Sequence, residues 1–290
     1  MPQLIYRIAD QYLVLHTPDP LATAAILPNY EPFRQPSIPD EIEPIVEVWG
    51  NCTCSQDADD KLLEEVNDIY YYSRVYKHGD GTRIEMKHLG VEEVGCFSAD
   101  WRKLHCRSAL TNSQARYLID RLIMIAFSIV TAGLKMLKVH ASVTELDGRA
   151  LIFLGVSGTG KSTHSRLWRE LVPGATLLND DEPIVRVMPD GSIRVYGCPW
   201  SGSTPCYRDR SADVAAFVHL YQSPENKLTK LGALQAFDSL FSSSAFMLSE
   251  SKVRQQVFNT VADVLERIPV YRLDCRPDAE AVSLTKSLLQ

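Results

Sequence analysis

The stretch "IFLGVSGTGKSTHSRLW", residues 152–168, decides the fold of this chain. A short apolar run comes first, a segment crowded with glycine, serine and threonine follows, and the remainder has the spacing of a helix. Gly155, Gly160, Lys161 and Ser162 match the GxxxxGK[ST] spacing of a P-loop. A strand, a glycine-rich turn and a helix in this order predict a loop that holds phosphate groups.

Each residue type in this loop has a physical reason. Glycines let backbone N–H groups turn inward toward phosphate oxygens, and the following helix offers its positive N-terminal end. Lys161 is expected to neutralise the β- and γ-phosphates of ATP, and the Ser162 hydroxyl to help hold Mg²⁺. The alternative is a purely structural glycine-rich turn. The expected nucleotide contacts are Gly155, Val156, Ser157, Gly158, Thr159, Gly160, Lys161, Ser162 and Thr163.

A phosphate-binding loop also needs acidic groups, and a pair follows in "LLNDDEP", residues 177–183. Asp180 and Asp181 end an apolar run, and the carboxyl end of a strand would place them beside the loop. Neighbouring carboxylates can divide labour there, one as a metal ligand and the other as a base for a hydroxyl proton. The alternative is a solvated acidic turn before Pro183.

Outward from this motif, the pattern predicts two domains, of residues 1–110 and 111–290. The first reads as β-rich and antiparallel, because its strand-like runs are rich in β-branched and aromatic residues. Residues 78–82, "HGDGT", are expected to form a hairpin turn, and the proline-rich stretch 27–44 an irregular excursion. The expected strands are 11–17, 44–50, 69–78 and 82–89.

The second domain is expected to open with a largely buried helix that ends near Leu134 and is capped by Thr111, Asn112 or Ser113. Strands and helices then alternate, which is the layout of an α/β sheet. Expected strands are 138–146, 149–155, 175–181, 192–202, 214–222 and 269–275; expected helices are 161–171, 232–246, 251–268 and 278–290.

Composition narrows the function classes. The formal net charge is −6 and no dense lysine and arginine run is present, so nucleic acid is not an expected partner. The N-terminus lacks a secretory pattern, and the most apolar segment, 122–134, is too short to cross a bilayer comfortably. Seven scattered cysteines fit reduced thiols, and "CTC" at 52–54 is expected to lie in a loop or strand rather than bind a metal. We expect a cytoplasmic protein.

"GVSGTGKST" at 155–163 followed by "NDDE" at 179–182 resembles two related families, the HPr kinase/phosphorylase and the ATP-dependent phosphoenolpyruvate carboxykinase. The resemblance covers about His140 to Gly202, and it implies an α/β P-loop domain of this type behind the β-rich domain. Carried over by position, Lys161 is similar to the phosphate-binding lysine and Ser162 to the metal-binding hydroxyl.

The same resemblance implies that Asp180 is the metal-side acid and Asp181 the base. His140 is similar to the histidine that precedes the loop in the kinase family, although alone it would read as a hydrogen-bonded core residue. Thr163 stands where that family has a glutamate, and no later acidic metal ligand is evident in "YGCPWSGSTPCYRDR". These departures weaken the expectation of the reverse, phosphorolytic activity, and the chain is short for a carboxykinase.

The resulting expectation is an ATP- and Mg²⁺-dependent kinase that transfers the γ-phosphoryl group to a hydroxyl, most readily a serine of a peptide or small protein. Arg208 and Arg210 are candidate contacts for the transferred group, against solvated loop arginines. The alternatives are a small-metabolite kinase and a nucleotide-gated peptide-binding module without transfer. The kinase relative suggests a homo-oligomer by analogy, and the sequence leaves the acceptor and the choice of ATP or GTP open.

Overall fold

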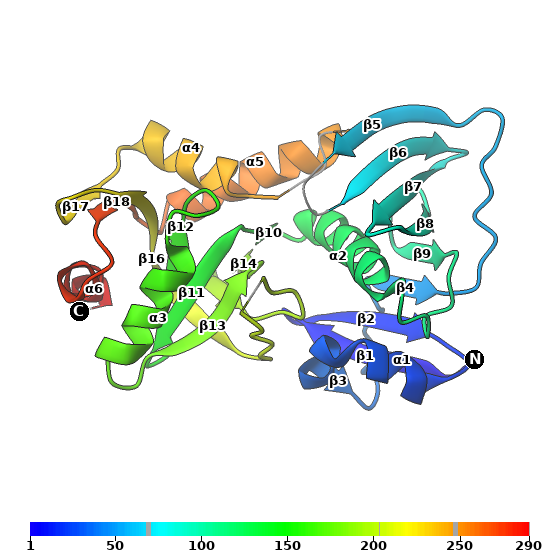
Figure 1. Cartoon of the computed structure of the whole chain (residues 1–290), viewed down its shortest axis with the longest axis horizontal. Coiled ribbons are helices and arrows are strands. Elements are labelled where there is room, and N and C mark those ends of the chain that lie inside the picture. The colour runs from blue at the N-terminus through cyan, green and yellow to red at the C-terminus, as the bar shows by residue number, and fades with distance from the viewer. Residues whose placement is uncertain (68–70, 203, 246–248, 290) are drawn as a thin grey trace. The chain divides into compact units, whose positions relative to one another are not determined.

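The chain forms two compact units in the computed structural model, each built on its own β-sheet (Figure 1). Both sheets mix parallel and antiparallel pairs, so this is an α/β protein with two mixed sheets. The structure describes residues 1–67, 71–202, 204–245 and 249–289. Of these, the first unit holds 1–131 and 249–251, and the second holds 132–245 and 252–289.

The first unit is a single curved run of strands with one long helix. Its strands are β1 (Gln3–Ile8), β2 (Gln11–His16), β3 (Arg34–Gln35), β4 (Val46–Trp49), β5 (Lys61–Asn67), β6 (Tyr72–His78), β7 (Gly81–His88), β8 (Val91–Phe97) and β9 (Lys103–Cys106). Their order in the sheet is β3-β1-β2-β4-β9-β8-β7-β6-β5. The helices are α1 (Pro20–Ile26), the 3-10 helix η1 (Pro28–Phe33) and α2 (Arg116–Ala132), which ends at the unit boundary.

The strands expected in this unit are present as β2, β4, β6 and β7, although Ile69 and Tyr70 of the third one lie outside the described residues. The hairpin turn is also confirmed, because β6 and β7 pair up to His78 and Gly81. The expectation of an all-antiparallel sheet is wrong. Strand β4 lies between β2 and β9 and is parallel to both, since a long connection precedes it and lets it insert between them.

The proline-rich stretch 27–44 is regular only in its first part, and residues 36–44 have the expected irregular backbone. Residues 28–33 form η1, and Pro28 stands in its first turn, where the missing N–H costs nothing. Tyr30 and Phe33 of η1 are fully buried, and the Tyr30 hydroxyl donates to Asp120 of α2 at 2.7 Å. Burial raises the pKa of the Asp120 carboxyl, and this hydrogen bond opposes the rise. The stretch therefore packs onto the first unit.

Helix α2 corrects the expected boundary between residues 110 and 111, because it belongs to the first unit. Leu122 is fully buried, and its methyl carbons lie 3.0 Å from the place of a Cβ on Gly95 of β8. The ring of Tyr117 also stacks at a tilt on His88 of β7, with centroids 4.4 Å apart. Helix α2 therefore packs on the first sheet (Figure 1) and buries Leu122 there.

The second unit carries the quoted motif. Its strands are β10 (Met136–Lys138), β11 (Ala141–Leu146), β12 (Arg149–Leu154), β13 (Thr176–Asp181), β14 (Ile184–Val187), β15 (Ile193–Tyr196), β16 (Ser211–Gln222), β17 (Lys227–Lys230) and β18 (Val270–Cys275). The helices are α3 (Lys161–Leu171), α4 (Ala233–Ser242), α5 (Ser251–Leu265), α6 (Ala279–Lys286) and the 3-10 helix η2 (Ser287–Leu289). The strand order is β10-β14-β15-β16-β12-β11-β13, with β18 also beside β16 and β17 beside β18.

One face of this second sheet packs under α3 and α6. Phe153 of β12 and Val218 of β16 join Trp168 of α3 and Val282 of α6 in one buried cluster. The Trp168 indole N–H donates to the Thr285 hydroxyl at 2.8 Å and ties the two helices together. This packing fixes where α3 begins, and therefore where the loop before it lies.

The expected strand 138–146 is broken in the structure. It splits into β10 and β11, and His140 lies at the bend between them with its backbone N–H bonded to the Ser243 carbonyl at 2.8 Å. Of the described helices, none is both long and apolar enough to cross a membrane.

Candidate functional site

The loop of residues 155–160 joins β12 to α3 in the way the sequence predicts. Gly155, Gly158 and Gly160 have φ of 144°, 84° and 105°, conformations that side chains with a Cβ rarely adopt. At Gly155 an added Cβ would also lie 2.6 Å from the Thr159 hydroxyl. The loop backbone therefore needs glycine at these points, and Val156 at its tip is 72% exposed.

Lys161 is the first residue of α3, and its side chain turns back into the loop. Its Nζ donates to the carbonyl oxygens of Gly155 at 2.7 Å and Val156 at 3.3 Å, and to His140 Nε2 at 2.9 Å. Burial lowers the pKa of Lys161, while the nearby Asp181 and Asp180 carboxylates oppose the shift. The ammonium thus lies at the mouth of the loop, next to the two aspartates.

His140 links Lys161 to Asp181. An ammonium has only donors, so Nε2 of His140 accepts from Lys161 and the ring proton stays on Nδ1. The Nδ1 nitrogen lies 3.1 Å from Asp181 Oδ1. The imidazole of His140 therefore lies between two charged groups, with the Lys161 ammonium at Nε2 and the Asp181 carboxylate at Nδ1.

Asp180 faces the start of α3 instead. The Ser162 hydroxyl donates to its Oδ1 at 3.1 Å, and the Asp180 side chain is buried. Strands β12 and β13 are both antiparallel to β11 and therefore run in the same direction. Their carboxyl ends meet at one sheet edge, as expected, and this brings the aspartate pair to the loop.

The segment after β15 holds the aspartates in place, a role that the sequence pattern does not predict. The Ser201 hydroxyl and the Gly202 N–H both donate to the Asp180 carbonyl, at 2.9 and 2.8 Å. The Asn179 side chain donates to the Trp200 carbonyl at 2.9 Å. A Ser-Gly pair directly after a strand-like run was the only signal for this role in the sequence.

The two arginines do not join this cluster. Arg208 is half-buried and Arg210 exposed, and neither guanidinium hydrogen-bonds to Lys161, Asp180 or Asp181 within the described part of the chain. The Arg210 carbonyl pairs with the Gly197 N–H at 3.0 Å, which fixes the backbone of this loop. Their contact with a phosphoryl group stays a prediction.

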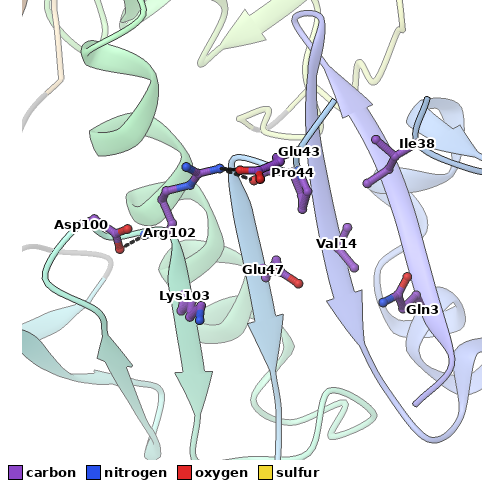
Figure 2. A pocket seen from close by; sticks show the side chains of 9 residues that line it. All are labelled: Gln3, Val14, Ile38, Glu43, Pro44, Glu47, Asp100, Arg102 and Lys103. Atoms are coloured by element: carbon purple, nitrogen blue, oxygen red, sulfur yellow. Dashed lines mark hydrogen bonds and ion pairs between the residues drawn. The ribbon is translucent and has the colours of Figure 1, made fainter. Parts of the chain in front are cut away.

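A shallow cavity of about 530 Å³ lies on the sheet of the first unit (Figure 2). Much of its charge is paired internally: Arg102 lies 3.5 Å from Glu43, and Glu47 2.7 Å from His16. Its lining residues are Gln3, Val14, Ile38, Glu43, Pro44, Glu47, Asp100, Arg102 and Lys103. The charge pairing gives no indication of a particular ligand.

Potential metal ligands also converge in the first unit. Within the described ranges, Asp57, Asp60 and His78 are the one group of acidic, histidine or cysteine side chains whose ligand atoms lie close together. His78 already pairs with Asp60 at 2.7 Å, and the Arg83 guanidinium lies 4.0 Å from the same carboxylate. His78 and Asp60 are therefore already paired with each other, and the Asp60 carboxylate is buried beside Arg83.

The chain matches one protein-family model over residues 106–279, more than half of its length. That model describes the SynChlorMet cassette protein ScmC. This chain belongs to the ScmC family. The matched range contains the loop, His140 and both aspartates, so the whole candidate site lies within the residues that the family model matches.

Other comparisons are weaker. No curated protein matches the chain. Among solved structures, the Hpr(Ser) kinase/phosphatase from Coxiella burnetii is similar at 12% identity and a TM-score of 0.31, over 52% of this chain and 87% of that one. A likeness at this level carries no functional statement about the ScmC chain.

Proposed function

We propose that this ScmC protein is an ATP-dependent kinase that transfers the γ-phosphoryl group to a hydroxyl, with a serine of a peptide or small protein as acceptor. One observation carries the proposal: His140 joins Lys161 to Asp181 at the mouth of a glycine-rich loop, at 2.9 and 3.1 Å. A cation for phosphate and a carboxylate for a proton are thus neighbours at the end of the sheet where β12 and β13 finish.

The loop and α3 supply the phosphate site. Backbone N–H groups at the helix N-terminus and the loop attract anionic oxygens. In the structure, the Lys161 ammonium donates hydrogen bonds to two neutral carbonyl groups and to one imidazole. These bonds already have an ionised donor, and a phosphate oxygen in place of one of the neutral acceptors would add the attraction between opposite charges.

The donor atoms beside the loop suit Mg²⁺. Ser162 Oγ and Asp180 Oδ1 lie 3.1 Å apart, and hydroxyl and carboxylate oxygens are the ligands this small cation prefers. Ser162 and Asp180 would therefore hold the metal, which when bound supplies charge neutralisation on the phosphates. The buried Asp180 carboxylate gains a second partner in this arrangement.

Asp181 takes the role of the base. The hydroxyl proton of the acceptor moves to its carboxylate, the acceptor oxygen bonds to the γ-phosphorus, and the bond to the β–γ bridging oxygen breaks to release ADP. The Nδ1–H of His140 holds Asp181 Oδ1 in place during this step. Lys161 stabilises the charge on the transferred phosphoryl oxygens.

Transfer of the labelled γ-phosphate tests the proposal. The wild-type protein is incubated with labelled ATP and Mg²⁺, and separate peptide and metabolite pools are offered as acceptors. We expect label in a serine-containing peptide. Asp181→Asn should bind ATP normally but lower kcat by about 10²- to 10⁴-fold, whereas Lys161→Ala should weaken both binding and transfer.

Asp40→Asn, an exposed aspartate of the first unit, is the matched control and should leave transfer unchanged. If the label appeared only in a metabolite, the protein would be a small-metabolite kinase and not a kinase of peptides or proteins. ATP-dependent peptide capture without any labelled product would favour the nucleotide-gated binding module. Full transfer by Asp181→Asn would show that the base is another group.

A further inference from the structure

The position of the nucleoside follows from which side of the loop the catalytic groups occupy. Strand β12, which leads into the loop, lies between β11 and β16 in the sheet. His140, Asp180 and Asp181 all belong to the β11 and β13 side. A triphosphate whose γ end reaches them therefore extends its nucleoside toward the other side, where β16 and β18 end.

The loop is fastened to that other side. Gln222 at the end of β16 donates its side-chain amide to the Gly158 carbonyl at 3.1 Å. The Leu220 carbonyl lies 3.3 Å from the place of a Cβ on Gly155. The end of β16 is thus a wall of the loop, and Tyr221 lies between Leu220 and Gln222 with its side chain on the other face of the strand.

At the end of β16, the guanidinium of Arg272 lies over the aromatic ring of Tyr221. The Arg272 guanidinium carbon is 4.1 Å from the Tyr221 ring centroid, and the Tyr221 ring stacks on His219 with centroids 4.9 Å apart. Both remain accessible, because Tyr221 is 40% exposed and the Arg272 side chain 46%. Stacked guanidinium and aromatic planes are surfaces on which nucleobases stack.

Arg272 is held in this pose by its own strand. Its Nε lies 3.0 Å from both carboxylate oxygens of Asp274, and its Nη2 2.6 Å from one of them. The guanidinium plane is therefore oriented before any ligand arrives, so less rotamer entropy is lost on binding.

We infer that the Tyr221–Arg272 pair is the stacking platform for the base of the nucleotide whose phosphates occupy loop 155–160. This inference rests on the proposed function, since it assumes a triphosphate at Lys161. The base lies over the guanidinium, and the sugar spans the end of β16.

The test compares ATP with inorganic tripolyphosphate, which has the phosphates and no base. Dissociation constants for both, with Mg²⁺, are measured by calorimetry for the full chain and its variants. Tyr221→Ala and Arg272→Ala should each weaken ATP by roughly 5- to 100-fold, as the loss of one stacked base predicts, and leave tripolyphosphate within about twofold.

Conservative variants separate stacking from folding. Tyr221→Phe keeps the ring and should bind ATP like the wild type, and Arg272→Lys keeps the charge but loses the plane and should resemble Arg272→Ala. Arg276→Ala removes a neighbouring exposed arginine that pairs with Asp278 and Glu280, and it should change neither ligand.

Two results would overturn this inference and leave the proposed function standing. Equal weakening of ATP and tripolyphosphate in Arg272→Ala would make Arg272 a phosphate contact, and unchanged ATP binding in Tyr221→Ala would place the base elsewhere. If the wild type bound neither ligand, or bound both regardless of Lys161→Ala, the proposed function would fail and this inference with it.

Discussion

Asp181 has a backbone conformation that its residue type rarely adopts. Its φ is 116°, a sparsely populated value that costs about 1–3 kcal/mol in a residue with a Cβ. Asp181 pairs with Ser201 as an isolated bridge, and the Ser201 hydroxyl and Gly202 N–H hold the preceding carbonyl. This segment therefore supports the strain and aims the carboxylate at His140.

Gly202 makes room for that carboxylate. A Cβ at residue 202 would lie 3.0 Å from Asp181 Cβ, 3.1 Å from Cγ and 3.2 Å from Oδ2, and φ at Gly202 is not in the left-handed region. Gly202→Ala should displace the Asp181 side chain and lower kcat by roughly 10- to 100-fold with little change in the KM for ATP.

Gly232→Ala is the matched control for steady-state kinetics, because nothing lies within 4 Å of its added Cβ. An unchanged kcat in Gly202→Ala would mean that the position of the Asp181 carboxylate does not limit transfer.

At the residue scale, the sequence predicted the candidate site residues but not the residues that hold them in place. Lys161, Ser162 and the aspartates, which the structure brings together, could be named because the P-loop pattern restricts residue types at short spacing. Ser201 and Gly202 could not, since their role depends on a contact between segments about twenty residues apart. The placement of His140 between Lys161 and Asp181 likewise depends on the bend between β10 and β11.

At the scale of elements, local pattern predicted β2, β4, β6 and β7 but missed β1, β5, β8 and β9. Strand β5 has a largely exposed pattern and β8 carries consecutive glutamates, so neither shows clear alternation. The parallel placement of β4 depends on partners distant in the chain, and no local signal encodes it. Helix α2 could be predicted from its apolar pattern. The unit to which it belongs could not, because the pattern does not show which sheet the apolar face packs against.

Leu122 tests the assignment of α2 to the first unit. Leu122→Ala leaves a cavity beneath the helix and should destabilise that unit by about 2–5 kcal/mol. Hydrogen exchange followed by mass spectrometry should show faster exchange in β7, β8 and β9 and unchanged exchange in β12, β13 and β16.

Leu21→Ala, at an 86% exposed position on α1, is the control and should have little effect. Faster exchange confined to the second unit would contradict the corrected boundary.

At the scale of the whole molecule, all residues proposed to bind phosphate or to transfer a proton belong to the second unit. A ligand that binds only the folded state stabilises it by RT ln(1 + [L]/Kd), about 2.7 kcal/mol at a hundred times Kd. ATP with Mg²⁺ should therefore slow hydrogen exchange in β11, β12 and β13.

This protection should disappear in Lys161→Ala and should be absent when ATP is replaced by adenosine, which lacks phosphates. Protection confined to the sheet of the first unit would mean that the nucleotide binds there.

The central claim is that a triphosphate lies on loop 155–160 beside the aspartate pair, and a crystal structure with Mg²⁺ and a non-hydrolysable ATP analogue tests it most directly. The account predicts β- and γ-phosphate oxygens within hydrogen-bond distance of the loop amides and Lys161 Nζ. It also predicts a metal between Ser162 and Asp180, with the γ-phosphorus facing Asp181. A nucleotide bound at any other place, or a loop whose amides point away from it, would contradict the account.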